Sequence, residues 1–293
     1  MNQELFFPHW NFAAIPPTYS GRENSKVVIL PVPYDSTTEW RGGTRDGSRA
    51  IIDASRYLEL YDIELAQEIY RVGIHTLPEL APDVSGPEHM TQRVYQVARE
   101  LLDEDKVLLM LGGEHSLTLG VVRAYREKYE SLSVLQLDAH ADLRDSYMGT
   151  GFSHATVMRR VCELCPIIPV GIRSLSQEEH EFMNEAGIRP FYAAGLVSGE
   201  YSSEQIVASL SSDVYITIDL DVLDPSIMPA VGTPEPGGIG WYELLALLRQ
   251  VAKSRHIVGF DLVELSPDEG PLSCAYLAAK LAYRLIGYMS YKW

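Results

Sequence analysis

The sequence predicts an α/β fold, in which a mostly parallel sheet is covered by helices on both faces. Apolar runs of strand length recur along the chain, and stretches with helical periodicity separate them. The runs are unbroken rather than alternating, as expected for strands covered on both sides. Polar clusters directly follow several runs, where parallel sheets carry their functional residues. The strand candidates are Val27–Pro31, Val72–Ile74, Val107–Leu111, Leu132–Leu137, Ile167–Val170, Val214–Ile218 and Ile257–Leu262.

Helix candidates alternate with these strands. They include Glu88–Glu104, Ser116–Arg126, Ala155–Leu164, Gln177–Ala186, Glu204–Leu210, Trp241–Ala252 and Pro271–Ile286. The chain has 293 residues, of which 46% are hydrophobic and 22% are charged, an ordinary globular composition. Because no repeat, low-complexity segment or shift in composition marks a boundary, residues 1–293 are expected to form a single domain.

The chain is acidic, with a formal net charge of −16. Nucleic acids and anionic membranes require a basic surface, so neither is an expected partner, whereas a small cationic substrate is compatible with this charge. No apolar run has the length of a membrane span, and residues 1–7 lack the features of a secretion signal. Cys162, Cys165 and Cys274 complete neither a zinc site nor a disulfide framework, which favours a reduced, cytoplasmic location.

The most informative motif follows the apolar run Leu132–Leu137. Asp138, His140 and Asp142 occupy alternate positions after this strand candidate. Alternate residues of a strand point to one side, so the three side chains converge if the extended geometry persists beyond the strand end. Ionised carboxylates are rarely buried without a partner, which argues against a purely structural role for the motif.

A second set of polar residues follows two other strand candidates. Asp219 and Asp221 come after Val214–Ile218, and His115 comes shortly after Val107–Leu111. Together with the first motif they provide two imidazoles and four carboxylates, which favour manganese, magnesium or a similar divalent ion. Six ligands exceed the needs of one ion but suit two ions with bridging carboxylates. Two such ions activate a shared water, so the residues indicate metal-dependent hydrolysis.

Each of these residues also has a structural interpretation. Taken alone, Asp221 is more typical of a turn or helix cap, and His115 of a hydrogen-bonded histidine. His154, which precedes a helix candidate, would cap it or face solvent, or else deliver a proton to a leaving amine. Glu264 would be a surface residue, or a carboxylate that holds a flat cation through two parallel hydrogen bonds. The loop of residues 224–238 is rich in proline and glycine and is expected to wall the site.

Four motifs in this order resemble those of the ureohydrolase family, which contains arginase and agmatinase. They are Gly112-Gly113-Glu114-His115-Ser116, Asp138-Ala139-His140-Ala141-Asp142, Asp219-Leu220-Asp221-Val222-Leu223-Asp224-Pro225 and Asp261-Leu262-Val263-Glu264. The resemblance runs from about Val27 to the C-terminal helix. It implies a three-layer α/β/α fold of the arginase/deacetylase type, two Mn²⁺ ions per chain and assembly into homotrimers or homohexamers.

The resemblance also implies a role for each site residue. It assigns His115 and Asp142 to one ion and His140 and Asp221 to the other, with Asp138 and Asp219 bridging both. A hydroxide shared by the ions would attack the central carbon of a guanidinium group. Glu264 corresponds to the residue that orients this guanidinium, His154 corresponds to the proton shuttle, and Asp142 also accepts a proton during the reaction.

The substrate implied by the resemblance is agmatine, which would be hydrolysed to urea and the polyamine putrescine. The run His154–Arg160 resembles bacterial and archaeal agmatinases rather than arginases. Arg144 is able to pair with a substrate carboxylate, so guanidino acids stay possible substrates, and the alternative is a guanidinobutyrase, arginase or formiminoglutamase.

Two residues depart from the common pattern: Glu114, expected to support the metal ligands, and Ala230, which replaces a frequent glycine. A single-zinc deacetylase is disfavoured because the chain has no His-His pair, and a non-catalytic scaffold because every ligand is present.

Overall fold

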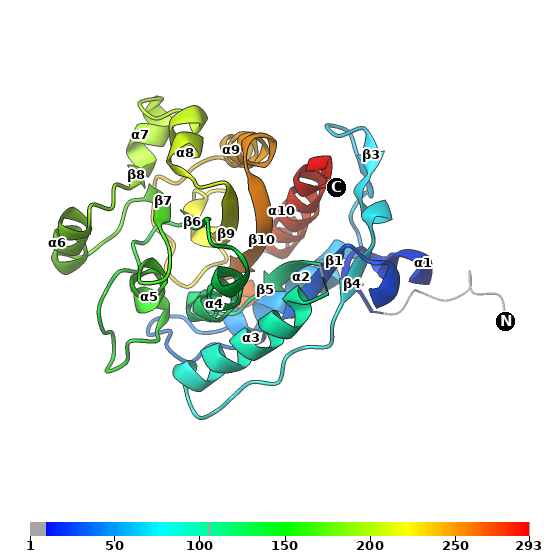
Figure 1. Cartoon of the computed structure of the whole chain (residues 1–293), viewed down its shortest axis with the longest axis horizontal. Helices are drawn as coiled ribbons and strands as arrows, with labels where there is room; N and C mark the ends of the chain where they lie inside the picture. The colour runs from blue at the N-terminus through cyan, green and yellow to red at the C-terminus, as the bar shows by residue number, and fades with distance from the viewer. Residues whose placement is uncertain (1–9, 105, 293) are drawn as a thin grey trace.

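A computed structural model describes residues 10–104 and 106–292 of the chain. Its main sheet has eight parallel strands in the order β4-β1-β5-β10-β9-β6-β7-β8 (Figure 1). The strands are β1 (Val27–Pro31), β4 (Ile74–Thr76), β5 (Val107–Leu111), β6 (Leu132–Leu137), β7 (Ile167–Ile172), β8 (Phe191–Tyr192), β9 (Asp213–Asp219) and β10 (His256–Val263). A separate antiparallel hairpin pairs β2 (Tyr61–Asp62) with β3 (Gln67–Glu68).

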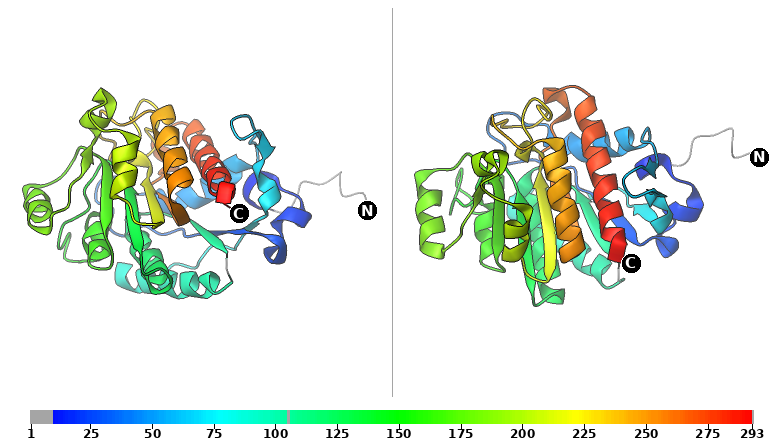
Figure 2. Two further views of the ribbon diagram at one scale, coloured as in Figure 1. Left: turned by 45° about the horizontal axis from the view of Figure 1, so that its top comes forward. Right: turned by 90° about the horizontal axis from the view of Figure 1, so that it is seen from above.

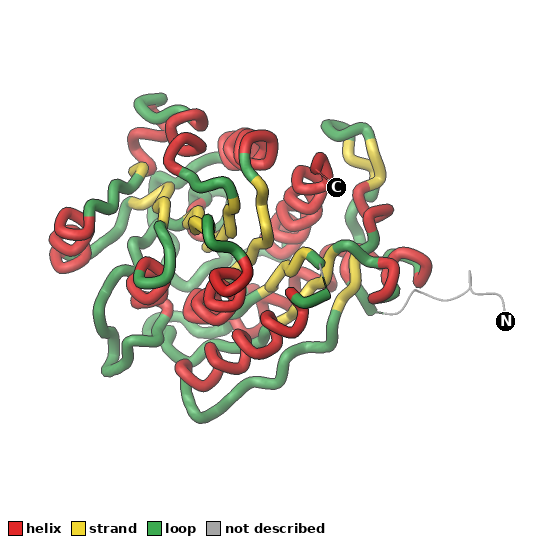
Figure 3. The backbone as a smooth tube through the Cα atoms, in the orientation of Figure 1, coloured by secondary structure: helices red, strands yellow, loops and turns green. Residues whose placement is uncertain are grey.

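Helices form a layer on each side of this sheet. One layer contains α2 (Gly47–Ser55), α8 (Ser203–Ser209), α9 (Trp241–Ser254) and α10 (Ser273–Met289). The other contains α3 (Pro87–Leu102), α4 (Thr118–Lys128), α5 (Val157–Cys162) and α6 (Gln177–Ala186). Figure 2 shows α9 and α10 side by side in orange and red, and Figure 3 shows the yellow strands between red helices.

Successive side chains of each strand point to opposite faces of the sheet, so the core is divided into two halves. In β1, Val27 and Ile29 pack into one cluster, while Val28 and Leu30 pack into the other. All four side chains are at most 2% exposed, because helices cover both faces of the strand. This arrangement explains the unbroken apolar runs, and it confirms the predicted three-layer α/β/α fold.

The observed elements differ from the predicted ones at Gly73 and at the edge of the sheet. The expected strand Val72–Ile74 is wrong in its position: residues Ile69–Val72 form a 3-10 helix and β4 begins at Ile74. Between them Gly73 has a φ of 81°, and a Cβ there would lie 2.5 Å from a backbone oxygen. The short edge strand β8 and the helices α1 (Pro17–Ser20), α2 and α7 (Ala193–Ser198) were not predicted, because their apolar patterns are short.

The strand order brings the four polar motifs to one edge of the sheet. The central strands lie in the order β5-β10-β9-β6, so the segments that follow them are neighbours although they are far apart in the sequence. Among the residues described, no helix is long and apolar enough to cross a membrane. The expectation about residues 1–7 falls outside the described part of the chain, and the single-domain organisation stays a prediction.

Candidate metal centre and active site

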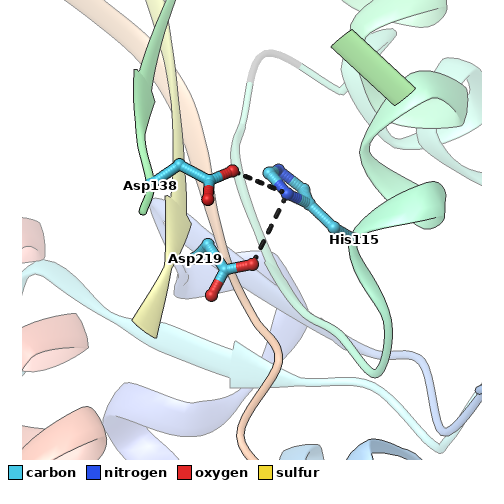
Figure 4. Close-up of side chains that lie close together, drawn as sticks. All are labelled: His115, Asp138 and Asp219. Atoms are coloured by element: carbon cyan, nitrogen blue, oxygen red, sulfur yellow. Dashed lines mark ion pairs between the residues drawn. The ribbon is translucent and has the colours of Figure 1, made fainter. Parts of the chain in front are cut away.

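Two overlapping groups of side chains have the composition and spacing of metal sites. The first consists of His115, Asp138 and Asp219, which approach one another from the ends of β5, β6 and β9 (Figure 4). His115 Nδ1 lies 3.2 Å from Asp138 Oδ2, 3.0 Å from Asp142 Oδ2 and 3.6 Å from Asp219 Oδ2. Figure 4 shows the two carboxylates turned toward the imidazole. All three side chains are buried.

The second group consists of Asp138, His140 and Asp221. His140 Nδ1 lies 2.8 Å from Asp221 Oδ2 and 3.8 Å from Asp138 Oδ1. Asp138 belongs to both groups, and its two oxygens face different histidines. The structure thus gathers all six predicted metal ligands in one place, with one carboxylate shared between two adjacent sets.

A chain of hydrogen bonds orients the His115 ring. Its Nε2 lies 2.8 Å from Thr217 Oγ1, and the Thr217 hydroxyl donates to Asp261 Oδ1 at 2.7 Å. Because Thr217 uses its hydrogen on Asp261, it accepts from the imidazole, which places the ring hydrogen on Nε2. His115 Nδ1 is buried and has no hydrogen-bond partner among the described residues. This nitrogen faces the carboxylates, as a metal ligand requires.

The pKa values show that the carboxylates are crowded. Burial, followed by repulsion from Asp142 and Asp221, raises the pKa of Asp138 to about 7. Burial and the neighbouring carboxylates also raise the pKa of Asp219 well above its usual range. Burial lowers the pKa of His140, but attraction to Asp221 outweighs it and raises that pKa to about 10. Such a cluster requires positive charge, and divalent cations supply it, so the residues fit a metal centre.

Two of the predicted site residues have left-handed backbone conformations. Asp142 has a φ of 54° and Glu264 has a φ of 66°, which are uncommon for residues other than glycine. Extended geometry therefore ends before Asp142, although the predicted convergence of the three side chains is observed. Extended pairing reaches His140, which bridges to Ser174, and the chain then turns to bring the Asp142 carboxylate toward His115.

Glu264 and His154 contribute to the same cavity, which has a volume of about 220 Å³. The Glu264 carboxylate is only 9% exposed and accepts a hydrogen bond of 2.6 Å from the His115 backbone N–H. His154 lies outside the two groups of metal ligands: its Nδ1 is 3.0 Å from Thr37 Oγ1 and its Nε2 is 3.3 Å from Glu39 Oε2. It is the first residue of a 3-10 helix that Ser153 caps, so the structural interpretation of His154 as the cap is wrong.

The cavity walls come from several loops. The cavity is lined by His140, Asp142, Asp219 and Asp221, whereas His115 and Asp138 are fully buried and do not line it. Gly232 and Thr233 also line it, which confirms that the loop of residues 224–238 walls the site.

The two departures from the family pattern have local explanations. Glu114 does not contact the metal ligands through its carboxylate. Instead, it accepts hydrogen bonds from the backbone N–H groups of Ser36 and Thr37 at 2.6 and 2.7 Å, and so anchors the loop that contacts His154. Ala230 packs against Gly270, where the lack of a side chain leaves room for the alanine methyl group.

The loop that follows β1 supplies cavity residues that the sequence did not indicate. Thr38, Glu39, Trp40 and Arg41 all line the cavity. These four residues belong to no recognisable sequence motif. Only the folded structure reveals them, through the contacts of Glu39 with His154 and Tyr147.

Residues 25–287 match the Arginase family, and the chain belongs to this family. An N(1)-aminopropylagmatine ureohydrolase of Synechocystis is 40% identical over 274 residues, which cover 90% of this chain and 89% of that protein. An agmatinase of Pyrococcus horikoshii is 34% identical over 275 residues, covering 90% and 92%. The crystal structure of agmatine ureohydrolase of Thermoplasma volcanium has a TM-score of 0.88 at 31% identity, covering 99% of this chain and 98% of that one.

These similarities confirm the predicted family and the predicted class of enzyme, an amidinohydrolase acting on guanidino C–N bonds. The family depends on a binuclear metal centre, and the two overlapping groups of His and Asp residues are candidates for it.

Proposed function

We propose that the chain is a manganese-dependent ureohydrolase that converts agmatine to putrescine and urea. The main support is one juxtaposition: the nearly buried carboxylate of Glu264 lines the same cavity as four of the six candidate metal ligands. A guanidinium held by Glu264 would have its central carbon beside the metal centre. The cavity volume suits a small linear molecule rather than a macromolecule.

The proposed ligands divide the six side chains between two ions. His115 and Asp142 would hold one Mn²⁺, His140 and Asp221 the other, and Asp138 and Asp219 both. When bound, the ions supply an activated water for hydrolysis. The oxygen-rich ligand set favours manganese over a thiolate-selecting metal.

The remaining chemistry falls to the protein's own side chains. Glu264 accepts two parallel hydrogen bonds from the guanidinium, which fixes the plane of the group. His154 donates a proton to the departing nitrogen, because an alkylamine leaves only when it is protonated. Asp142 accepts the proton that the attacking water releases. One C–N bond breaks and one C–O bond forms, and the products are urea and a protonated diamine.

A second candidate substrate is N(1)-aminopropylagmatine. It is favoured by the 40% identity to the Synechocystis protein of that name and by the additional carboxylate of Glu39 in the cavity wall. A guanidino acid or arginine stays the alternative that Arg144 would favour, because Arg144 also lines the cavity.

A substrate panel tests this proposal. The manganese-loaded protein is incubated with agmatine, N(1)-aminopropylagmatine, 4-guanidinobutanoate, arginine and formiminoglutamate, and urea or formamide is measured. We expect the two guanidino amines to have the highest kcat/KM. Faster release of urea from arginine or 4-guanidinobutanoate, or of formamide from formiminoglutamate, would contradict it. The cytoplasmic location and the trimeric or hexameric assembly stay predictions.

A further inference from the structure

Two glutamates line the cavity besides Glu264. One is Glu179, which is buried and accepts hydrogen bonds from the backbone N–H groups of Leu143 and Ser176. The other is Glu39. Its Oε1 accepts a hydrogen bond of 3.0 Å from the Tyr147 hydroxyl, and its Oε2 lies 3.3 Å from His154 Nε2. A carboxylate has about four acceptor positions, so these two contacts hold the group in place and leave positions open. The Glu39 side chain is 36% exposed, which makes it accessible to a ligand in the cavity.

The exposure of the lining residues distinguishes the closed end of the cavity from its mouth. Glu264 is 9% exposed and lies at the closed end, beside the metal ligands. The side chains of His154 and Glu39 are 20% and 36% exposed, and Trp40 is 62% exposed. A guanidinium at Glu264 would therefore extend its chain past His154 toward Glu39 and the mouth.

Two arginines also line the cavity, but neither forms an ion pair with Glu39 among the described residues; the basic group beside Glu39 is the imidazole of His154. Arg41 forms an ion pair with Glu269, and its guanidinium lies 4.2 Å from the centre of the Trp40 ring. The Arg144 guanidinium lies over the Tyr147 ring, 5.2 Å from its centre. The Glu39 carboxylate and the Tyr147 hydroxyl oxygen thus form an acceptor pair for a cation.

We infer that Glu39, positioned by Tyr147, binds an ammonium group at the end of the substrate away from the guanidinium. This inference rests on the proposed function and narrows it: the substrates are guanidino amines, with a positive charge at both ends, rather than guanidino acids. A carboxylate tail would meet the Glu39 charge and be disfavoured.

The test compares two substrates that differ only in the distal charge. Agmatine and n-butylguanidine share the guanidinium and the four-carbon chain, but only agmatine carries an ammonium. In the wild-type enzyme kcat/KM should be higher for agmatine. In Glu39→Gln this preference should fall by about tenfold, and the relative rate with 4-guanidinobutanoate should rise. Glu185→Gln, an exposed substitution on α6, is the matched control and should retain the wild-type preference.

A purely structural role for Glu39 predicts a different outcome. If Glu39 only positions His154, the variant loses kcat equally on agmatine and n-butylguanidine, and the preference is unchanged. That result would overturn the inference. Tyr147→Phe provides a second variant, because it removes the hydroxyl that holds Glu39 but keeps the ring; it should reduce the preference in the same direction. Failure of the proposed function is separate: the wild-type enzyme would then release no urea from either substrate.

Discussion

His115 Nε2 lies 2.8 Å from the hydroxyl oxygen of Thr217, although 102 positions separate the two residues in the chain. The Thr217 hydroxyl in turn donates a hydrogen bond to Asp261. This carboxylate is fully buried and also accepts hydrogen bonds from Thr118 and Tyr215. Residues from β9 and β10 therefore determine which nitrogen of a histidine after β5 faces the candidate metal site. Such outer contacts orient the ligand and increase its basicity.

This relationship predicts that Thr217→Val weakens manganese binding. Valine has nearly the same shape but leaves His115 Nε2–H and Asp261 without their shared partner, so the affinity should fall about 10- to 100-fold. Titration of the metal-free protein with Mn²⁺ measures the change. Thr91→Val is a suitable control, since the Thr91 hydroxyl is buried and has no hydrogen-bond partner among the described residues. An unchanged isotherm for Thr217→Val would remove the orienting role.

Glu264→Gln should separate substrate binding from metal binding. The glutamine oxygen still accepts the hydrogen bond from the His115 backbone, but the negative charge that pairs with a guanidinium is lost. We expect two bound Mn²⁺ per chain and a kcat/KM for agmatine at least about 30-fold lower, the equivalent of about 2 kcal/mol. Metal analysis and urea release measure the two effects. Activity equal to that of Glu185→Gln would exclude Glu264 from the mechanism.

His154→Gln should reduce kcat with little effect on the metal. His154 lies in the cavity wall rather than in either group of ligands, and its proposed task is proton delivery to the departing nitrogen. Loss of such a group costs about 10²- to 10⁴-fold in rate. Steady-state kinetics with agmatine and a manganese titration test this. The control is His180→Gln on α6, where the histidine is exposed; a kcat near the wild-type value for His154→Gln would contradict the proposed role.

The metal-free protein should lose stability as the pH rises from about 5 to 8. Carboxyl groups of the unfolded chain titrate near pH 4, whereas the pKa of Asp138 is raised to about 7 and that of Asp219 is also raised. The folded state therefore binds more protons in this range. Each additional proton lowers the free energy of unfolding by about 1.4 kcal/mol per pH unit.

His115 and His140, whose pKa values are also raised, extend the loss of stability from about pH 6.5 to about pH 10. Manganese should raise the Tm more at pH 8 than at pH 6, because the ligands must be deprotonated to bind it. Thermal melts of the chelated and the manganese-loaded protein at several pH values measure both trends. Asp219→Asn should flatten the metal-free dependence, and a Tm that rises with pH in the metal-free wild type would refute the prediction.

Much of the fold was predictable because its signals are local. Each strand that is buried on both faces requires a continuous apolar run, as Val107–Leu111 and Leu132–Leu137 illustrate. Elements with little core contact had no such signal, so the edge strand Phe191–Tyr192 was missed. The position of β4 was wrong because Gly73 breaks the apolar run that contains it.

The sequence by itself determined which side chains carry the chemistry and where they follow the strands, because the motifs place histidines and aspartates directly after apolar runs. Only the tertiary structure decided how they meet. The order β5-β10-β9-β6 brings distant segments together, left-handed turns aim Asp142 and Glu264, and the loop after β1 adds Glu39. These features depend on contacts through space between residues far apart in the chain, which no local pattern encodes.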